Sequence, residues 1–275
     1  MKKIILVVFS VMISTVVLAQ NKQKIKGNKQ VITTSNSIDK AFHKIEIDDA
    51  LEVSMSQSDK NSYVLITDEN LHEVVHFIVI DSVLKIATTH KISRSKKLKI
   101  ALDFVKLEKI TLKNGAKIKG EGVFNSKVMH IDSYNSSEFE LDIKAEEVTV
   151  NMLQKSKGTL KIKVTNTTFL MSDKARLEAR VLADNVTAKL MNSADLNLEG
   201  EAKKATFSLK DAADIKAKEM KISAVDVYTS GSADAAIYAD KNLTLYAEGK
   251  SKVEIYGEPI IEIKGFKGSA KLFKK

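Results

Sequence analysis

A short motif recurs every 17 to 21 residues over the second part of this chain. Each copy is a small residue, then a polar residue, then an apolar residue, inside a stretch whose apolar side chains alternate like those of a β-strand. A single unit of this length has no second layer against which to bury its apolar side, so the copies must stack on one another. The small residues of nine copies are Ala116, Ser137, Gly158, Ala175, Ala194, Ala213, Ala233, Ser251 and Ala270.

This spacing favours a β-solenoid. At about 3.3 Å per strand residue, a unit of roughly 20 residues can make one full turn, and equal positions on successive turns would lie about 4.8 Å apart. Propeller blades need about 40 residues and four strands per unit, which is twice this period. The sequence therefore predicts an all-β chain in which residues 106–275 form a solenoid of about 20 residues per turn. The small residues are expected to stack in one crowded column.

Upstream of the repeats the pattern is less regular. Residues 40–105 alternate in polarity from Phe42 onward, with turn residues between the apolar runs but without a fixed period. We expect this segment to be an irregular β section that caps the end of the array. Residues 20–39 are polar and unpatterned and predict a flexible leader.

The first residues predict export. Residues 1–19 begin with two lysines, continue with an apolar run from Ile4, and end in a small-residue cleavage site at Ala19. The apolar run is short and no charge cluster follows it directly, which favours a cleaved signal peptide over a membrane anchor. The mature chain would then have no transmembrane span and would work in the periplasm, on the outer-membrane surface or outside the cell.

Composition narrows the chemistry. The chain has no cysteine, which excludes a lipid anchor on cysteine, disulfides, a thiol nucleophile and thiolate metal sites. Without Lys2 and Lys3 the chain has 42 basic against 35 acidic residues, a surplus of +7. That surplus favours acidic partners such as envelope polysaccharide or lipid headgroups. The lysines alternate with apolar residues and form no aromatic-interleaved patch, so nucleic acid is not an expected partner.

Three segments carry a resemblance to a known family. Phe42 to Ile47 has the pattern Phe-x-x-Ile-x-Ile, and Asn70 to Ile86 leads from Asn-Leu to a Val-Leu-Lys-Ile strand. The segment Ile255-Tyr256-Gly257-Glu258-Pro259, followed by Lys267 to Ala270, resembles a Tyr-x-Gly-x-Pro ending. Together with the predicted signal peptide and the repeats, these segments resemble the auto-transporter adhesin head GIN domain family over residues 40–275. That family comprises envelope proteins, mainly of Bacteroidetes, whose role is not established. The resemblance implies a right-handed parallel β-helix and an adhesin-like role.

His72 to His76 matches the His-Glu-x-x-His pattern of zinc proteases. Such a site requires both histidines on one face of a helix. Residues Val74 to Ile80 are mostly β-branched and predict a strand, in which positions i and i+4 lie about 13 Å apart. We therefore predict no metal site here and no cofactor.

A more informative set of polar residues follows the small residues. Three aspartates on successive turns would lie near one another at the solvent surface. Their carboxylates could hold a calcium ion, could serve with a basic residue in a polysaccharide lyase, or could form an ordinary solvated face. As binding residues we name Asp195, Asp214, Asp234 and Arg176, and we name no catalytic residue. The full set is Lys117, Glu138, Thr159, Arg176, Asp195, Asp214, Asp234, Lys252 and Lys271.

The sequence as a whole favours an exported, non-enzymatic cell-envelope or surface module that is adhesin-like and binds envelope or host polysaccharide or a surface protein. The alternative is a polysaccharide-active β-helix enzyme, either a lyase or a hydrolase. The two hypotheses differ in geometry, because an enzyme requires a groove in which the aspartates meet Arg176 or Lys252 within hydrogen-bond reach. Four Asn-x-Ser/Thr sequences, at Asn135, Asn166, Asn185 and Asn242, are no more than chance predicts in such a chain.

Overall fold

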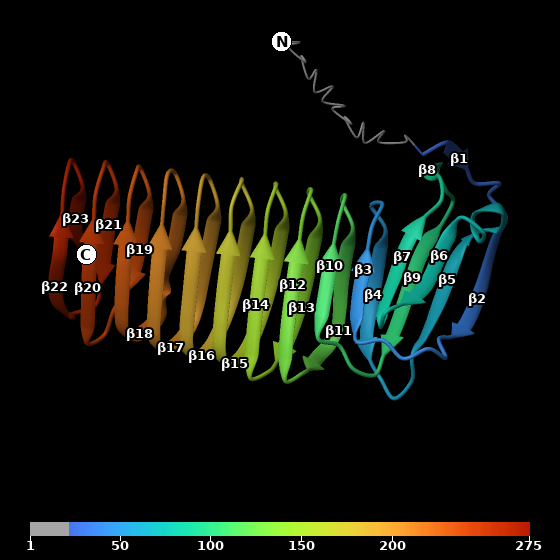
Figure 1. The fold of residues 1–275 in the computed structure, drawn as a ribbon, viewed down its shortest axis with the longest axis horizontal. Helices are drawn as coiled ribbons and strands as arrows, with labels where there is room; N and C mark the ends of the chain where they lie inside the picture. Colours follow the sequence, from blue (N-terminus) through green and yellow to red (C-terminus); the bar gives the residue numbers. More distant parts are fainter. Residues whose placement is uncertain (1–21) are drawn as a thin grey trace, which may run out of the picture.

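The computed structural model of the protein describes residues 22–275, and the signal peptide predicted over residues 1–19 lies outside them. The described chain is almost entirely β and forms a solenoid of about nine turns with about 19 residues per turn. The predicted all-β class and the solenoid architecture are therefore confirmed. Figure 1 shows the turns side by side along the long axis of the molecule. Within residues 22–275, no helix is long and apolar enough to cross a bilayer.

The elements fall into an amino-terminal group and a repeat group. The first group is β1 (Lys24–Lys26), β2 (Val31–Ser37), β3 (Lys44–Ile47), β4 (Glu52–Gln57), β5 (Ser62–Asp68), the 3-10 helix η1 (Glu69–Leu71), β6 (Val75–Ile80), β7 (Val83–Thr88), β8 (Lys91–Arg94) and β9 (Leu98–Phe104). The second group is β10 (Lys109–Leu112), β11 (Lys117–Asn125), β12 (Val128–Ser133), β13 (Glu138–Lys144), β14 (Glu147–Met152), β15 (Lys157–Met171), β16 (Arg176–Leu190), β17 (Asp195–Leu209), β18 (Asp214–Thr229), β19 (Asp234–Tyr238), β20 (Asn242–Ala247), β21 (Lys252–Tyr256), β22 (Ile260–Phe266) and β23 (Lys271–Lys274).

Each turn adds one strand to each of two parallel stacks. Face A contains β7, β3, β10, β12, β14, the second halves of β15 to β18, β20 and β22. Face B contains β9, β4, β11, β13, the first halves of β15 to β18, β19, β21 and β23. Long strands such as β15 bend from face B to face A, and the two stacks enclose the core between them.

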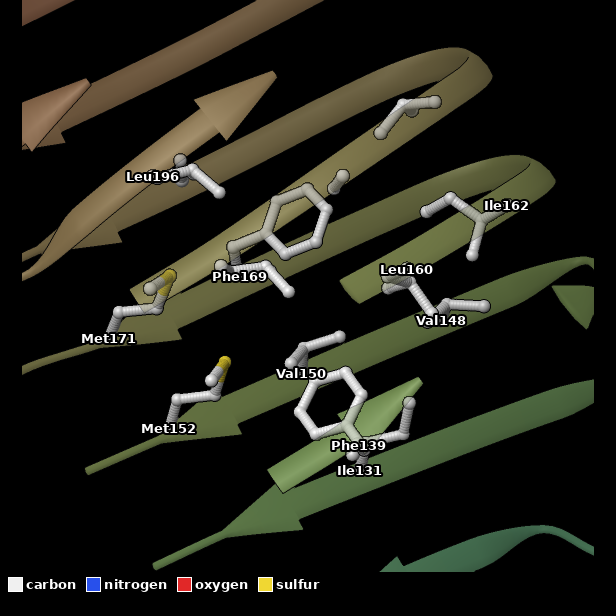
Figure 2. Close-up of a cluster of buried hydrophobic side chains, with 14 of the residues drawn as sticks. Ile131, Phe139, Val148, Val150, Met152, Leu160, Ile162, Phe169, Met171 and Leu196 are labelled. Carbon is white, nitrogen blue, oxygen red and sulfur yellow. The ribbon is translucent and has the colours of Figure 1, made fainter. Parts of the chain in front are cut away.

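The core follows from strand alternation. Every second side chain of each strand points inward, and the buried residues form one continuous cluster along the solenoid. Figure 2 shows a section of it, in which aromatic and aliphatic side chains of successive turns, such as Phe169 and Val150, pack between the two faces. The tight turns from face A to face B carry residues with positive φ. Asn114, Asn135 and Asp211 occupy this position in several turns, because Asn and Asp tolerate the left-handed conformation better than other side chains.

The predicted column of small residues exists, with one correction. The backbone N–H of the residue after each small residue donates to the carbonyl of the previous small residue, as from Asp195 to Ala175 at 2.9 Å and from Asp214 to Ala194 at 2.9 Å. In the β15 turn this position belongs to Ser156, which is fully buried, and not to Gly158. A Cβ atom added to Gly158 would lie 2.3 Å from the ring of Phe139, which is too close for any side chain. Gly158 is therefore small because the ring of Phe139 occupies the space that its side chain would need. The corrected column is Ala116, Ser137, Ser156, Ala175, Ala194, Ala213, Ala233, Ser251 and Ala270.

Strand order in space differs from strand order in the chain at the amino-terminal end. The turn made by β3 and β4 lies between the later turn of β7 and β9 and the later turn of β10 and β11. Figure 1 shows this as blue strands between teal and green ones. Beyond β7 and β9, the strands β6, β5 and β2 pair antiparallel and end the stack on each face.

The segment expected to be a flexible leader is tied into this end. Of residues 20–39, the described part contains β1, which pairs with β8, and β2, which pairs with β5 over seven residues. Polar patterning did not reveal this, because β2 lies at an edge, where both faces of a strand can be polar. The expectation of a flexible leader was therefore wrong for these residues.

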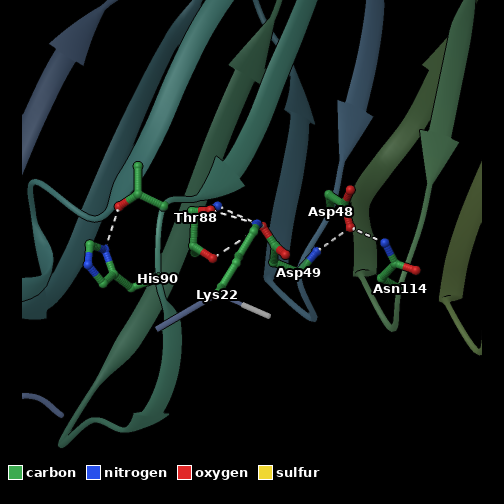
Figure 3. A network of polar contacts seen from close by, with 7 residues as sticks. Lys22, Asp48, Asp49, Thr88, His90 and Asn114 are labelled. Atoms are coloured by element: carbon green, nitrogen blue, oxygen red, sulfur yellow. Dashed lines mark hydrogen bonds and ion pairs between the residues drawn. The ribbon is translucent and has the colours of Figure 1, made fainter. Parts of the chain in front are cut away.

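Two carboxylates hold the amino-terminal end together. Asp68 is fully buried and accepts backbone N–H groups from Lys29 at 2.9 Å, Lys96 at 3.0 Å and Lys97 at 3.3 Å. Burial alone would raise the pKa of Asp68, but these bonds outweigh it and hold the pKa below its ordinary value. Asp49 accepts the N–H and the hydroxyl of Thr88 at 2.8 Å and 3.1 Å and pairs with Lys22 (Figure 3).

Candidate functional site

The three predicted aspartates do form a ladder on face B. Asp195, Asp214 and Asp234 occupy equal positions on successive turns, in register with one another. The ammonium group of Lys216 lies 3.5 Å from Asp195 and 3.8 Å from Asp214 and bridges the first two. Burial raises the pKa of Asp214, and the neighbouring charges of Asp195 and Asp234 raise it further, whereas Lys216 lowers it. The predicted repulsion is thus present and only partly compensated.

Arg176 lies beside the ladder but takes part in a different surface. It is in register with Asp195 on one side and Lys157 on the other. Its side chain lines an open hollow of ≈ 640 Å³ together with Glu52, Lys117 and Glu138, and the three aspartates do not line that hollow. Lys252, at the other end of the ladder, pairs with Glu254 at 2.6 Å. The aspartates and the two basic residues therefore do not converge on one groove.

The corrected register completes the charged column. It runs Glu52, Lys117, Glu138, Lys157, Arg176, Asp195, Asp214, Asp234, Lys252 and Lys271. Lys157 takes the place that the sequence analysis assigned to Thr159, because the small residue of that turn is Ser156. Opposite charges alternate in the early part, where Lys117 pairs with Glu138 at 2.8 Å. Face B is a charged surface along most of its length.

The His-Glu-x-x-His segment lies in the amino-terminal part and is split between two elements. His72 lies just after η1, and β6 begins at Val75, close to the predicted strand start at Val74. His72 contacts Thr34 Oγ1 at 3.3 Å, while His76 contacts the carbonyl of Glu73 at 3.0 Å. No group of three or more His, Cys, Asp or Glu side chains is placed to hold a metal ion anywhere in residues 22–275.

Face A has a different surface, which the sequence analysis missed. Its outward side chains include a column of hydroxyls in which the four threonines from β14 to β17 are in register. The column continues through Asp226 to Thr244. A second column contains amides, and the side chain of Asn185 donates to that of Asn166 at 2.9 Å. The threonines are Thr149, Thr168, Thr187 and Thr206.

Aromatic and apolar side chains border these hydroxyls. Tyr228 and Tyr246 are neighbours in register on face A, and Tyr228 is 45% exposed. Nearby, an open hollow of ≈ 410 Å³ is lined by Leu153, Leu170 and Met191 among others. Face A therefore offers hydroxyl and amide groups, two tyrosine rings and a mostly apolar hollow on one side of the solenoid, with the charged Asp226 and Lys204 among them.

The signal for face A was present in the sequence. The Asn-x-Thr sequences at Asn166, Asn185 and Asn242 are separated by 19 residues and by three times 19 residues, so they share one phase of the repeat. In the structure Asn166 and Asn185 are neighbours in one column, which continues through Lys204 and Ala224 to Asn242. Asn242 therefore lies three turns beyond Asn185. These three sequences are part of the surface pattern, and attributing them to chance was wrong.

Comparison with known proteins agrees with the fold. A family model described as "Putative auto-transporter adhesin, head GIN domain" matches residues 41–183 and 156–259. The chain belongs to this family. The adhesin family resemblance drawn from the sequence is thereby confirmed. No curated protein matches the chain.

Solved structures show the same architecture. A "putative adhesin" from Parabacteroides merdae has a TM-score of 0.66 and 20% identity, and the match covers 92% of this chain and 99% of that one. A "putative lipid binding protein" from Parabacteroides distasonis has a TM-score of 0.66 and 19% identity, covering 92% and 100%. A "putative adhesin" from the same species has a TM-score of 0.64 and 20% identity, covering 92% and 100%. At these identities the likeness concerns the fold alone.

Proposed function

We propose that this member of the family is an exported, non-enzymatic surface-binding module that uses face A to bind an extended, neutral polysaccharide of an envelope or host surface. The observation that carries the proposal is the ladder of hydroxyl and amide side chains on face A. Family membership supports a binding role, because the family is described by adhesion.

The chemistry of face A suits a glycan. Hydroxyl and amide groups both donate and accept hydrogen bonds, as sugar hydroxyls require. Tyrosine rings offer an apolar surface with a polar tip, against which the C–H faces of a sugar ring can pack. From Thr149 to Thr206 the hydroxyls repeat on four successive turns, about 4.8 Å apart. A polymer with repeating hydroxyls can therefore engage several turns at once, and individually weak contacts add up through a high effective concentration.

A glycan array with the exported chain tests this proposal. Thr187→Val together with Thr206→Val removes two neighbouring hydroxyls of face A while keeping a β-branched side chain. Thr159→Val is the matched control, because Thr159 is exposed on face B. We expect the double variant to lose binding to the captured glycan and the control to keep it. Equal losses in both variants, or no neutral glycan bound by the unaltered chain, would contradict the proposal.

The enzymatic alternative makes a separate prediction. A lyase or hydrolase would shorten the polysaccharide, and Asp214→Asn would abolish that activity because Asp214 is the central carboxylate of the ladder. We expect no change in polymer length when the exported chain is incubated with the bound glycan and the products are separated by size. Shortening that depends on Asp214 would replace the binding proposal by the enzymatic one.

The calcium hypothesis for the aspartate ladder has a test of its own. No three acidic side chains in residues 22–275 are placed to share one metal ion, which argues against a built calcium site. If a divalent cation does bind the ladder, millimolar calcium raises the melting temperature, and changing Asp195, Asp214 and Asp234 to Asn removes the rise. Lys216, which already bridges two of the carboxylates, should make the rise small. Identical melting temperatures in calcium and in chelator would eliminate the cation and leave an ordinary charged surface.

A further inference from the structure

The carboxyl-terminal end of the solenoid exposes its core. In the last turn, β22 pairs with β20 and β23 pairs with β21, and nothing in residues 22–275 covers their outer edges. Ile263 continues the inward column of Leu245 but is 52% exposed, whereas Leu245 is fully buried. Phe266 is likewise 45% exposed. Within residues 22–275 the apolar interior is therefore uncovered at this end.

Two outward side chains of the same turn are apolar as well, among charged ones such as Glu262 and Lys271. Ile260, at the start of β22, is 77% exposed, and Phe273 in β23 is 41% exposed. An exposed cluster of large apolar side chains is unusual for a surface without a partner. The last turn thus presents four exposed apolar side chains, which we call the apolar tip: Ile263 and Phe266 from the open core, Ile260 from the outer side of face A and Phe273 from the outer side of face B.

Lysines surround this tip. The segment from residue 257 to residue 275 contains five lysines and two glutamates, a surplus of +3. Two lysines lie close to aromatic rings: Lys275 Nζ is 6.0 Å from the ring of Phe273, and Lys267 Nζ is 5.7 Å from that of Tyr246. The lysines are Lys264, Lys267, Lys271, Lys274 and Lys275. The partner of this end must therefore be negatively charged and must also accept apolar side chains.

A second copy of the chain does not meet these requirements. Two such ends face to face would bring a surplus of +3 against +3. Lys274 also occupies an inward position, in register with the fully buried Ile255, and it pairs with Glu258. A protein layer stacked on this end would therefore bury the ammonium group of Lys274, which is costly. Lys274 thus favours a partner that leaves this rim in contact with water.

We propose that the carboxyl-terminal end docks end-on onto an anionic lipid bilayer. The lysines would contact lipid phosphates, while the four apolar side chains would enter the boundary between headgroups and acyl chains. Long lysine side chains can keep their charge at the phosphates while their stems follow the apolar tip. The bare edges of β22 and β23 limit the depth, because unpaired backbone groups are not tolerated in the hydrocarbon region. The contact is therefore peripheral, and it is independent of the proposed glycan binding by face A.

Vesicle flotation tests the proposal. The protein used is the exported chain, and mass spectrometry verifies that the predicted signal peptide has been removed. The probes are vesicles of phosphatidylglycerol and phosphatidylcholine in equal parts, compared with vesicles of phosphatidylcholine alone. We expect binding only to the anionic vesicles, and weaker binding as salt is raised. Lys267→Glu with Lys271→Glu should weaken binding by at least about tenfold, because each lysine near an anionic surface contributes on the order of fivefold.

A tip variant and a matched control complete the test. Ile260→Ser with Phe273→Ser should also weaken binding, which a purely electrostatic contact would not show. Ile80→Ser with Lys99→Glu makes the same kinds of change at exposed positions of the amino-terminal end and should bind like the unaltered chain. All variants should keep the melting temperature. Binding to uncharged vesicles, equal losses in the control, or a concentration-dependent dimer that the tip variant abolishes without any vesicle binding would each overturn the proposal.

Discussion

The two ends of the solenoid solve the same physical problem differently. At the amino-terminal end, antiparallel β5 and β6 extend the stack past the β7 and β9 turn, and the rings of Tyr63 and Phe77 stack at 3.7 Å between the two faces. Behind them Ile86 is fully buried. At the carboxyl-terminal end Ile263, which lies in the same inward column as the fully buried Leu84 of the β7 turn, is half exposed. A repeat array needs a cap where its core would otherwise meet water, and within residues 22–275 only the amino-terminal end has one.

The largest expected effect comes from replacing one inward isoleucine by alanine at each end and comparing the losses of stability. Ile86→Ala should destabilise the protein by about 2 to 5 kcal/mol, because it leaves a cavity under the cap. Ile263→Ala should change stability by less than about 1 kcal/mol, since its side chain is already half in water. Urea unfolding followed by circular dichroism measures both. Equal losses would mean that the last turn is covered in solution.

The column of small residues allows a second paired test. Ala194 is fully buried between two turns, so Ala194→Leu should destabilise by about 1 to 3 kcal/mol through overpacking. Ala270 holds the same position in the last turn, where it is only partly buried. Ala270→Leu should therefore be tolerated, with a change within about 0.5 kcal/mol. If Ala194→Leu leaves the urea midpoint unchanged, the column is less crowded than the structure indicates.

Acid should distinguish the amino-terminal end from the middle of the solenoid. Asp68 and Asp49 have pKa values below their ordinary value of 3.8, so the stability they contribute is present above that pH and is lost as the pH falls through their lower folded values. The pKa of Asp214 is raised, so its contribution favours folding below 3.8 and is lost as the pH rises through its folded value. Acidification should therefore loosen β2 and β5 before β18 and β19.

Hydrogen exchange, corrected for the intrinsic pH dependence of amide exchange, measures this order. Asp68→Asn should loosen β2 at neutral pH, because an amide is a poorer acceptor for three backbone N–H groups than a carboxylate is. Asp214→Asn serves as the comparison and should leave exchange in β18 unchanged or slightly slower. Uniform loosening of the whole chain below pH 3.8 would show that the cap does not open as a separate unit.

Much of the candidate site could be predicted from the sequence, because a solenoid is built from local repeats. The phase of the small residues placed Asp195, Asp214 and Asp234 on successive turns, and the structure shows them in register. The phase of the small residues gave the wrong residue in the β15 turn. Gly158 is small because it lies opposite Phe139, whereas the residue of the column is Ser156, two positions earlier. The phase also could not show that Lys216 bridges the ladder, since a side chain's direction depends on its neighbours in space.

The sequence by itself determined the β class, the repeat length and the stacking of the turns, because strand alternation and a fixed period are properties of neighbouring residues and recur with each copy. Only the tertiary structure decided that the β3 and β4 turn inserts between two later turns, and that β2 joins the cap. Those pairings join segments far apart in the chain, and the choice between them depends on which arrangement buries the core and satisfies the backbone. The same holds for the open end, because Ile263 and Leu245 have the same inward position and differ only in whether another turn covers them.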